Sequence, residues 1–188
     1  PTIKRYLVAK VSGKAITHSL PHIAVLAHAA NHSELEAIES HYQRQRYANT
    51  SLYVVVGEGM SPPVSDDPRV HWLKSDQAKT MVVAEIDKKA ELIAGMVAAD
   101  YYGPNYLEDM ALATRYTQAD LIGKAARYIW EGGKIRLTHT DHAYHPVSRL
   151  PARAAAIRRQ GIAQENVLAW VQSLGTHQLQ ADRGLAID

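Results

Sequence analysis

An acidic side chain directly follows an apolar run in the middle of this chain. Residues 94–99 (Ala-Gly-Met-Val-Ala-Ala) are uncharged, and they are followed by Asp100, Tyr101, Tyr102 and a turn at Pro104. An uncharged run that stops at one acid is typical of a buried strand that delivers a polar side chain to a sheet edge. Ligands of open α/β sheets collect at the carboxyl ends of strands. Asp100 is therefore either a ligand of a metal ion or ribose, or the acid of a turn.

Two other charged side chains occupy positions where α/β proteins commonly carry their sites. Lys124 ends an expected strand, where an ammonium group either binds a phosphate or is simply solvated. Glu165 begins an expected helix, where the helix dipole stabilises a carboxylate. A carboxylate can remove the proton of a hydroxyl group as a general base. Glu165 is therefore either a catalytic base or a helix-start acid.

A histidine-rich segment offers a third kind of chemistry. His139, Asp141 and His145 share one face of an extended segment, because the side chains of a strand alternate. Two imidazoles and a carboxylate can hold a transition metal, as in a metal-dependent hydrolase. The spacing from Asp141 to His145 is too long for a straight strand to close around one ion. This spacing favours a polar loop that lines a cleft.

The composition is that of an ordinary globular protein. The 188 residues are 46% hydrophobic and 21% charged, with a formal net charge of +2. So small a net charge argues against a nucleic-acid partner, which usually needs a concentrated basic face. The absence of Cys is compatible with a reducing, cytoplasmic compartment, and no apolar run approaches the ~20 residues of a transmembrane helix. Phe is absent and Tyr occurs ten times, so buried Tyr hydroxyls need hydrogen-bond partners.

Hydrophobic patterning and turn residues predict alternating strands and helices. In chain order, the expected elements are a strand over 20–27, a helix over 33–47 capped by Asn31 or Ser33, strands over 51–56 and 69–74, a helix over 75–94, a strand over 96–99, a helix over 105–116, a strand from 120, a hairpin over 128–139, and helices over 151–160 and 165–174. This order predicts an α/β fold with a Rossmann-type, mostly parallel central sheet, helices on both faces and a small antiparallel addition. We expect one domain over residues 1–188, with an N-terminal extension over 1–19 and a core from about residue 20.

Residues 100–126 resemble the nucleotide-sugar-dependent glycosyltransferases of family two, especially those of bacterial capsule and surface-polysaccharide synthesis. The resemblance rests on the run Tyr-Tyr-Gly-Pro-Asn-Tyr-Leu from Tyr101 and on Gly-Lys-Ala-Ala at 123–126. Weaker matches extend it over most of the chain after residue 20. The resemblance implies a GT-A fold and the transfer of a sugar from a nucleotide diphosphate to a hydroxyl group of a glycan acceptor.

The resemblance also implies roles for individual residues. Glu165 would act as the catalytic base, and Asp100 would hold a divalent cation, Mg²⁺ or Mn²⁺, beside the sugar diphosphate. The residues that would contact the nucleotide sugar are His28, Asn31, Glu58, Asp100, Tyr101, Tyr102 and Lys124.

The chain departs from the family pattern at two places. Val97, Ala98 and Ala99 stand where the family usually has Asp, so the expected cation binding is weak. Asn166 stands at the second position of the family's Glu-Asp motif, so Glu165 would have to act as the base. The alternatives are a non-catalytic GT-A-like domain that binds a glycan or another protein, or an engineered variant. A homo-oligomer or a larger assembly is compatible with the short chain.

Overall fold

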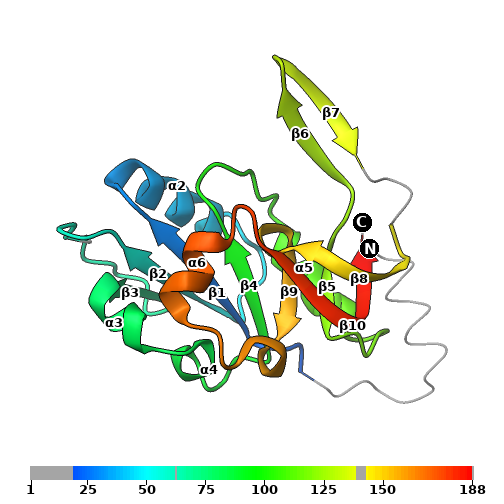
Figure 1. Cartoon of the computed structure of the whole chain (residues 1–188), viewed down its shortest axis with the longest axis horizontal. Coiled ribbons are helices and arrows are strands. Elements are labelled where there is room, and N and C mark those ends of the chain that lie inside the picture. The colour runs from blue at the N-terminus through cyan, green and yellow to red at the C-terminus, as the bar shows by residue number, and fades with distance from the viewer. Residues whose placement is uncertain (1–18, 62, 139–142, 188) are drawn as a thin grey trace.

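The computed structural model describes residues 19–61, 63–138 and 143–187. The elements in chain order are β1 (Ile23–Ala29), α2 (His32–Gln43), β2 (Thr50–Val56), β3 (Val70–Lys74), α3 (Ser75–Thr80), α4 (Val83–Ile86), β4 (Leu92–Met96), α5 (Tyr106–Ala113), β5 (Leu121–Lys124), β6 (Arg127–Glu131), β7 (Lys134–Thr138), β8 (Pro146–Pro151), the 3₁₀ turn η2 (Ala152–Ala154), β9 (Ala155–Arg158), the 3₁₀ turn η3 (Arg159–Ile162), α6 (Val167–Ser173) and β10 (Gln178–Ile187). Figure 1 shows their arrangement. The expected N-terminal extension lies outside the described residues, apart from its last residue.

One mixed sheet forms the centre of the fold. In the described part of the chain its strands follow the order β3-β2-β1-β4-β9-β5-β10-β8. β1 pairs in parallel with β2 and β4, β2 with β3, and β5 with β10. β9 is antiparallel to β4 and β5, and β8 is antiparallel to β10. The expected α/β fold with a mostly parallel sheet is confirmed, and the β6–β7 hairpin is the small antiparallel addition.

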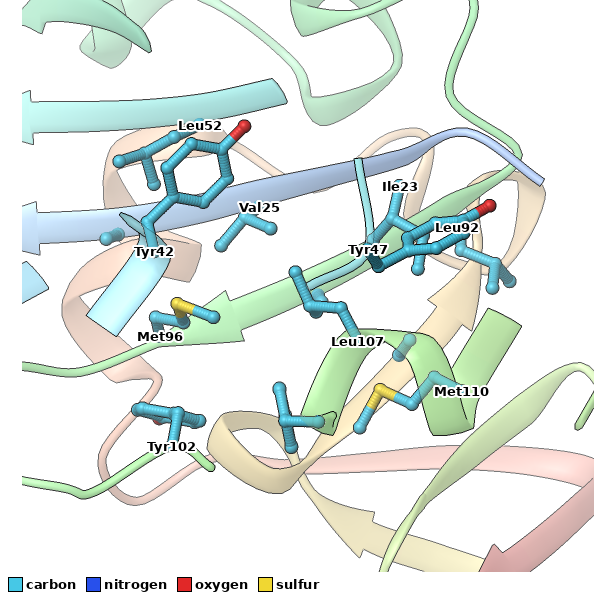
Figure 2. Packing of buried hydrophobic residues seen from close by; sticks show 14 of the residues in the cluster. Ile23, Val25, Tyr42, Tyr47, Leu52, Leu92, Met96, Tyr102, Leu107 and Met110 are labelled. Atoms are coloured by element: carbon cyan, nitrogen blue, oxygen red, sulfur yellow. The ribbon is translucent and has the colours of Figure 1, made fainter. Parts of the chain in front are cut away.

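Helices cover both faces of this sheet. α2 and α5 pack on one face through a cluster that includes Leu35, Leu107 and Met110. Figure 2 shows the side chains of this cluster gathered between strands and helices. α3, α4 and α6 pack on the other face through a second cluster that includes Val83 and Trp170. Since both faces are buried, β1 and β4 are apolar apart from His28 near the end of β1.

The buried tyrosines have the hydroxyl partners that the composition requires. The Tyr42 hydroxyl donates to the Thr50 carbonyl oxygen at 3.1 Å, and the Tyr47 hydroxyl donates to the Pro21 carbonyl oxygen at 2.6 Å. Each ring packs in the first cluster while its polar atom is satisfied by backbone at the cluster edge. The core is therefore built without Phe and without leaving these hydroxyls unpaired.

The helix expected over 75–94 and the strand expected over 96–99 are wrong. Two short helices, α3 and α4, end at a turn in which the Asp87 carboxylate accepts from the Lys89 backbone N–H at 2.9 Å. β4 then begins at Leu92 and is fully buried between β1 and β9. The pairing of β4 with β1 and β9 stabilises a strand here, although the local residue spacing favours a helix.

The helix expected over 151–160 is also wrong. This segment contains η2, β9 and the beginning of η3, and β9 lies in the middle of the sheet. Ala155 lies opposite Gly123, and Ala156 lies opposite both Ala94 and Ile122. Small side chains on β9 and β5 permit this close central pairing, although an alanine-rich segment favours a helix when it stands alone.

Candidate functional site

The loop after β4 lies at the point where the strand order of the sheet reverses. β2 and β3 lie on one side of β1, and β4 lies on its other side. In doubly wound sheets, ligands bind outside the carboxyl ends of the strands at such a point. The loop of residues 97–105 leaves β4 here and leads to α5, and it carries Asp100. Asp100 therefore lies beyond the carboxyl end of a strand, at the position expected for a ligand site.

Tyr102 fixes the shape of this loop from inside the core. Its hydroxyl accepts from the Val97 N–H at 3.1 Å and donates to the Arg153 carbonyl oxygen at 3.0 Å. The side chain is only 4% exposed, and burial raises its pKa far above the ordinary value, so it stays neutral. The structure gives Tyr102 a positioning role through these internal hydroxyl bonds, and Tyr102 also lines a cavity beside the loop, so its contact with a ligand stays a prediction.

Asp100 and Tyr101 stand on the open side of the loop. Arg153 Nη1 lies 3.4 Å from Asp100 Oδ1, and both side chains are about one-third exposed. The Tyr101 ring is exposed, and the guanidinium carbon of Arg44 lies 4.8 Å from its centroid. The site therefore offers an acid, two guanidinium groups and an aromatic face within reach of solvent.

A cavity of about 440 Å³ opens beside the loop, and we call it the strand-end cavity. Its walls come from the end of β1, the first turns of α2, the loop after β4 and the end of α6; they comprise His28, Ser33, Glu34, Ala37, Val97, Ala98, Ala99, Val171, Gln172 and Gly175. Burial lowers the pKa of His28, and the nearby charge of Glu34 opposes this effect. His28 therefore presents a neutral ring at pH 7 in a cavity that is also lined by the apolar side chains of Ala37, Val97, Ala98, Ala99 and Val171.

A larger cavity of about 780 Å³ lies between the same loop and the β6–β7 hairpin, and we call it the hairpin cavity. Ala99 lines both cavities, so they adjoin at this residue. The charged residues that line the hairpin cavity are Asp100, Asp109, Lys124, Arg127 and Arg153. Lys124 forms an ion pair with Asp109 at 2.8 Å. Two acids against three bases leave this cavity with a small excess of positive charge.

The remaining expected contacts to a nucleotide sugar have structural partners. Asn31 is the N-cap of α2, as expected, and its side-chain oxygen accepts from the Glu34 N–H at 3.0 Å. Glu58 is exposed and forms an ion pair with Lys79 at 3.0 Å, and it lines neither cavity. The structure separates Glu58 from the cavities. The expected ligand residues that it brings to them are His28, Asp100, Tyr101, Tyr102 and Lys124.

Glu165 lies at the opposite edge of the sheet from Asp100. Its carbonyl oxygen accepts from the Val83 N–H at 2.9 Å, which places it beside α4 and before the amino end of β4. α6 starts beside the segment that carries α3 and α4, as Figure 1 shows. Its end lines the strand-end cavity. The start of α6 therefore points away from the loop after β4, and Glu165 cannot act as a base on a ligand of Asp100.

The acids at the loop after β4 do not suit a divalent cation. Mg²⁺ and Mn²⁺ prefer several oxygen ligands, and Val97, Ala98 and Ala99 supply none beside Asp100. The one available carboxylate already faces Arg153. Among the residues that the structure describes, no group of three His, Asp or Glu side chains is arranged to hold a metal ion. Of the histidine-rich segment, His139 and Asp141 lie outside the described residues.

Arg153 is a site residue whose partners the sequence does not reveal. The arginines at 149, 153, 158 and 159 predict a basic helix that either is solvated or clamps a diphosphate, whereas the structure places Arg153 in η2 beside the loop after β4. Its carbonyl oxygen accepts from the Tyr102 hydroxyl, and its guanidinium faces Asp100. No local signal connects the two segments, because their contact follows from the insertion of β9 beside β4.

Comparison with known proteins supports the fold and no closer relationship. No protein-family model matches the sequence, and no curated protein is similar to it. The structure is similar to S. aureus TarS 1–349 in complex with UDP-GlcNAc, with a TM-score of 0.55 and 11% identity over 88% of this chain and 55% of that one. A second structure of TarS 1–349 gives a TM-score of 0.51 and 10% identity, over 88% of this chain and 57% of that one.

This chain spans just over half the length of the TarS chains that it resembles. At this level of identity the similarity shows the fold alone, which is a mixed α/β fold shared with TarS. No helix among the described residues is long and apolar enough to span a membrane.

Proposed function

We propose that this protein is a glycosyltransferase-like domain that binds a nucleotide sugar across the two adjoining cavities. The observation that supports this is the position of the cavities, which meet at Ala99 outside the carboxyl ends of β1 and β4. TarS, which shares the fold, binds UDP-GlcNAc. In this proposal the nucleoside occupies the strand-end cavity beside the neutral ring of His28. The sugar lies in the hairpin cavity, over Asp100 and Tyr101.

Arg153 supplies the positive charge that the diphosphate of such a ligand needs. A guanidinium group binds phosphate oxygens through two parallel hydrogen bonds and stays charged at every physiological pH. Tyr102 fixes the Arg153 backbone, and Asp100 lies 3.4 Å from its Nη1. This pair is loose and about one-third exposed, so a phosphate can replace Asp100 as the partner of Arg153. Binding is therefore expected without a divalent cation.

Calorimetric titration with UDP-GlcNAc tests the binding proposal. Wild-type protein is expected to bind with the same affinity in EDTA and in Mn²⁺. Arg153→Ala is expected to weaken binding by about 10- to 100-fold, because a hydrogen bond to a charged group contributes ~1.5–3 kcal/mol. Arg153→Lys retains the charge and loses the two-pronged geometry, so a smaller loss is expected.

Glu165→Gln is the matched control, since it changes an acid at the opposite edge of the sheet. It is expected to leave the affinity unchanged. Absence of binding by folded wild-type protein, or binding that EDTA abolishes, would contradict the proposal. An Arg153→Ala variant with wild-type affinity would remove Arg153 from it.

Transfer of the sugar to a glycan hydroxyl group is the second candidate function. The acceptor oxygen would attack the anomeric carbon, the bond to the diphosphate would break, and a carboxylate would take the hydroxyl proton. Asp100 is the acid that the hairpin cavity offers for this step, because Asp109 is held by Lys124. Asp100→Asn would then lower the rate of UDP release by 10²–10⁴-fold. Donor binding without any UDP release would leave the binding function alone.

A further inference from the structure

The β6–β7 hairpin carries an apolar face that the rest of the domain does not cover. Figure 1 shows the hairpin standing away from the central sheet. Tyr128 lies opposite Leu137, and Trp130 lies opposite Ile135, so all four side chains share one face. Tyr128 and Trp130 are each 73% exposed. Large aromatic side chains that are exposed together on a rigid element mark a binding surface.

The opposite face of the hairpin is polar apart from Ile129, and its polar side chains form contacts within the hairpin. Arg136 forms an ion pair with Glu131 at 3.1 Å, and the Thr138 hydroxyl donates to the Arg127 carbonyl oxygen at 3.2 Å. The turn at Gly132 and Gly133 has positive φ at both positions, which suits the twist of a two-residue hairpin. The hairpin is therefore a formed element with two chemically different faces.

The apolar face is continuous with the candidate site. Tyr128, Trp130 and Ile135 line the hairpin cavity together with Asp100 and Arg153. The cavity is thus lined by aromatic rings of the hairpin and by an acid paired with a guanidinium. Arg127 also lines it, and the buried Nε of Arg127 has no hydrogen-bond partner among the described residues. Hydrogen-bonding groups and aromatic faces therefore occur in one cavity.

We propose that the hairpin face is a subsite for a glycan chain that reaches the sugar position at Asp100. This inference rests on the proposed function and names its second ligand. A sugar ring has an apolar C–H face that packs on an aromatic ring, and hydroxyl groups that bind carboxylate and guanidinium groups. The cavity presents both kinds of partner. A protein partner that covers only the hairpin face would leave the charged residues of the cavity, Asp100 and Arg153 among them, without a role.

Trp130 makes the proposal directly measurable. Trp170 is buried and Trp72 is partly buried, so Trp130 is the tryptophan of this chain that solvent reaches most. We would titrate wild-type protein, without nucleotide, with chitotetraose, cellotetraose, maltotetraose and tetragalacturonate. At least one of them is expected to shift the tryptophan emission to shorter wavelength with saturation, because the ring becomes covered.

Calorimetry with the responding oligosaccharide then assigns the surface. Trp130→Ala and Tyr128→Ala are each expected to weaken oligosaccharide binding by about tenfold. Arg136→Ala, on the opposite face of the same hairpin, is the matched control and is expected to bind like wild type. Far-UV circular dichroism checks that each variant is folded.

Three results would overturn the subsite. The first is that none of the four oligosaccharides produces a saturable change. The second is that both aromatic variants bind like wild type. The third is that sedimentation shows self-association of the wild type that Trp130→Ala abolishes, which would make the face an interface between two copies. Oligosaccharide binding by a protein that fails to bind UDP-GlcNAc would instead overturn the nucleotide proposal and leave the subsite standing.

Discussion

The acidic side chains at the two edges of the parallel strands differ in burial and in their hydrogen-bond partners. Asp87 lies before β4, at the amino edge, and Asp100 lies after β4, at the carboxyl edge. Asp87 is 8% exposed and has partners for both carboxylate oxygens. Asp100 is about one-third exposed and has one partner at 3.4 Å. The same strand therefore connects an acid fixed by the fold to an acid that a ligand can reach.

The amino edge is held by a small polar network around Asp87. Its Oδ1 accepts from the Lys89 N–H, and its Oδ2 lies 2.9 Å from His22 Nε2 and accepts from the Tyr53 hydroxyl at 3.1 Å. His22 Nδ1 lies 2.9 Å from the side-chain oxygen of Asn49. Burial raises the pKa of Tyr53 to about 12, and the charge of Asp87 adds to this effect.

The difference in burial and in hydrogen-bond partners distinguishes structural acids from functional ones without the use of a sequence motif. A network in which each member has its partners stabilises the fold, and removing one member leaves a buried group unpaired. A polar group with a loose partner beside a cavity costs the fold little when it is changed. The amino edge should therefore respond to mutation through stability, and the carboxyl edge through ligand binding.

Asp87→Asn is expected to have the largest effect on stability. Asn keeps the size but replaces the charged acceptor and brings an N–H₂ group toward the donors of Lys89 and Tyr53. We expect the free energy of unfolding to fall by about 1–3 kcal/mol in urea denaturation, with UDP-GlcNAc affinity unchanged. Asp76→Asn is the control, because Asp76 is an exposed acid. A loss below ~0.5 kcal/mol, the level of an ordinary surface change, would contradict a structural role for the acid at the amino edge.

The contribution of Asp87 also has a defined pH dependence. Burial alone would raise its pKa, but the hydrogen bonds from the Lys89 N–H, His22 and Tyr53 lower the pKa below the ordinary value of 3.8. The unfolded chain therefore takes up this proton first as the pH falls. The stabilisation is fully present above about pH 5 and is lost as the pH falls through the folded pKa.

Wild type and Asp87→Asn should consequently differ most at pH 6 and least at pH 3. Urea midpoints of both proteins at pH 6, 5, 4 and 3 measure this difference. The titration of all other groups is common to both proteins and cancels when the two are compared. A difference that stays constant down to pH 3 would show that the Asp87 carboxylate is not the group responsible.

Local signals in the sequence were sufficient for the elements that depend on neighbours in the chain. Asn31 caps α2, and the turn at Gly132 and Gly133 closes the β6–β7 hairpin, because both rest on side-chain and backbone preferences of a few adjacent residues. β9 could not be predicted in this way. Its strand conformation depends on pairing with β4 and β5, and its alanines locally favour a helix.

The residues of the candidate site also differ in whether local sequence signals were sufficient to place them. The apolar run and its abrupt acid sufficed to place Asp100 beyond the carboxyl end of a strand. Arg153 and the edge at which Glu165 lies were out of reach, because both follow from the path of the chain after β9. Motif matching assigned Glu165 to the ligand side of a helix, whereas α6 begins at the other edge.

Adding acids beside Asp100 should change ligand binding at the carboxyl edge by a smaller free energy than Asp87→Asn changes stability. Val97 and Ala99 line the strand-end cavity, so Val97→Asp combined with Ala99→Asp adds two carboxylates next to Asp100. We expect UDP-GlcNAc affinity to rise about tenfold in Mn²⁺, which corresponds to ~1.4 kcal/mol, and to show no gain in EDTA. Calorimetry of wild type and variant under both conditions measures the effect. Equal affinities with and without Mn²⁺ would show that the loop does not hold a cation even with three acids.

The smallest expected effect on stability is that of Asp100→Asn. The pair with Arg153 is long, at 3.4 Å, and both side chains are about one-third exposed, so solvent screens most of the attraction. The backbone of the loop is held separately by the Tyr102 hydroxyl, which the substitution does not touch. We therefore expect a change in unfolding free energy of at most about 0.5 kcal/mol, measured in urea beside Asp87→Asn. A loss as large as that of Asp87→Asn would make Asp100 a structural acid and erase the difference between the two edges.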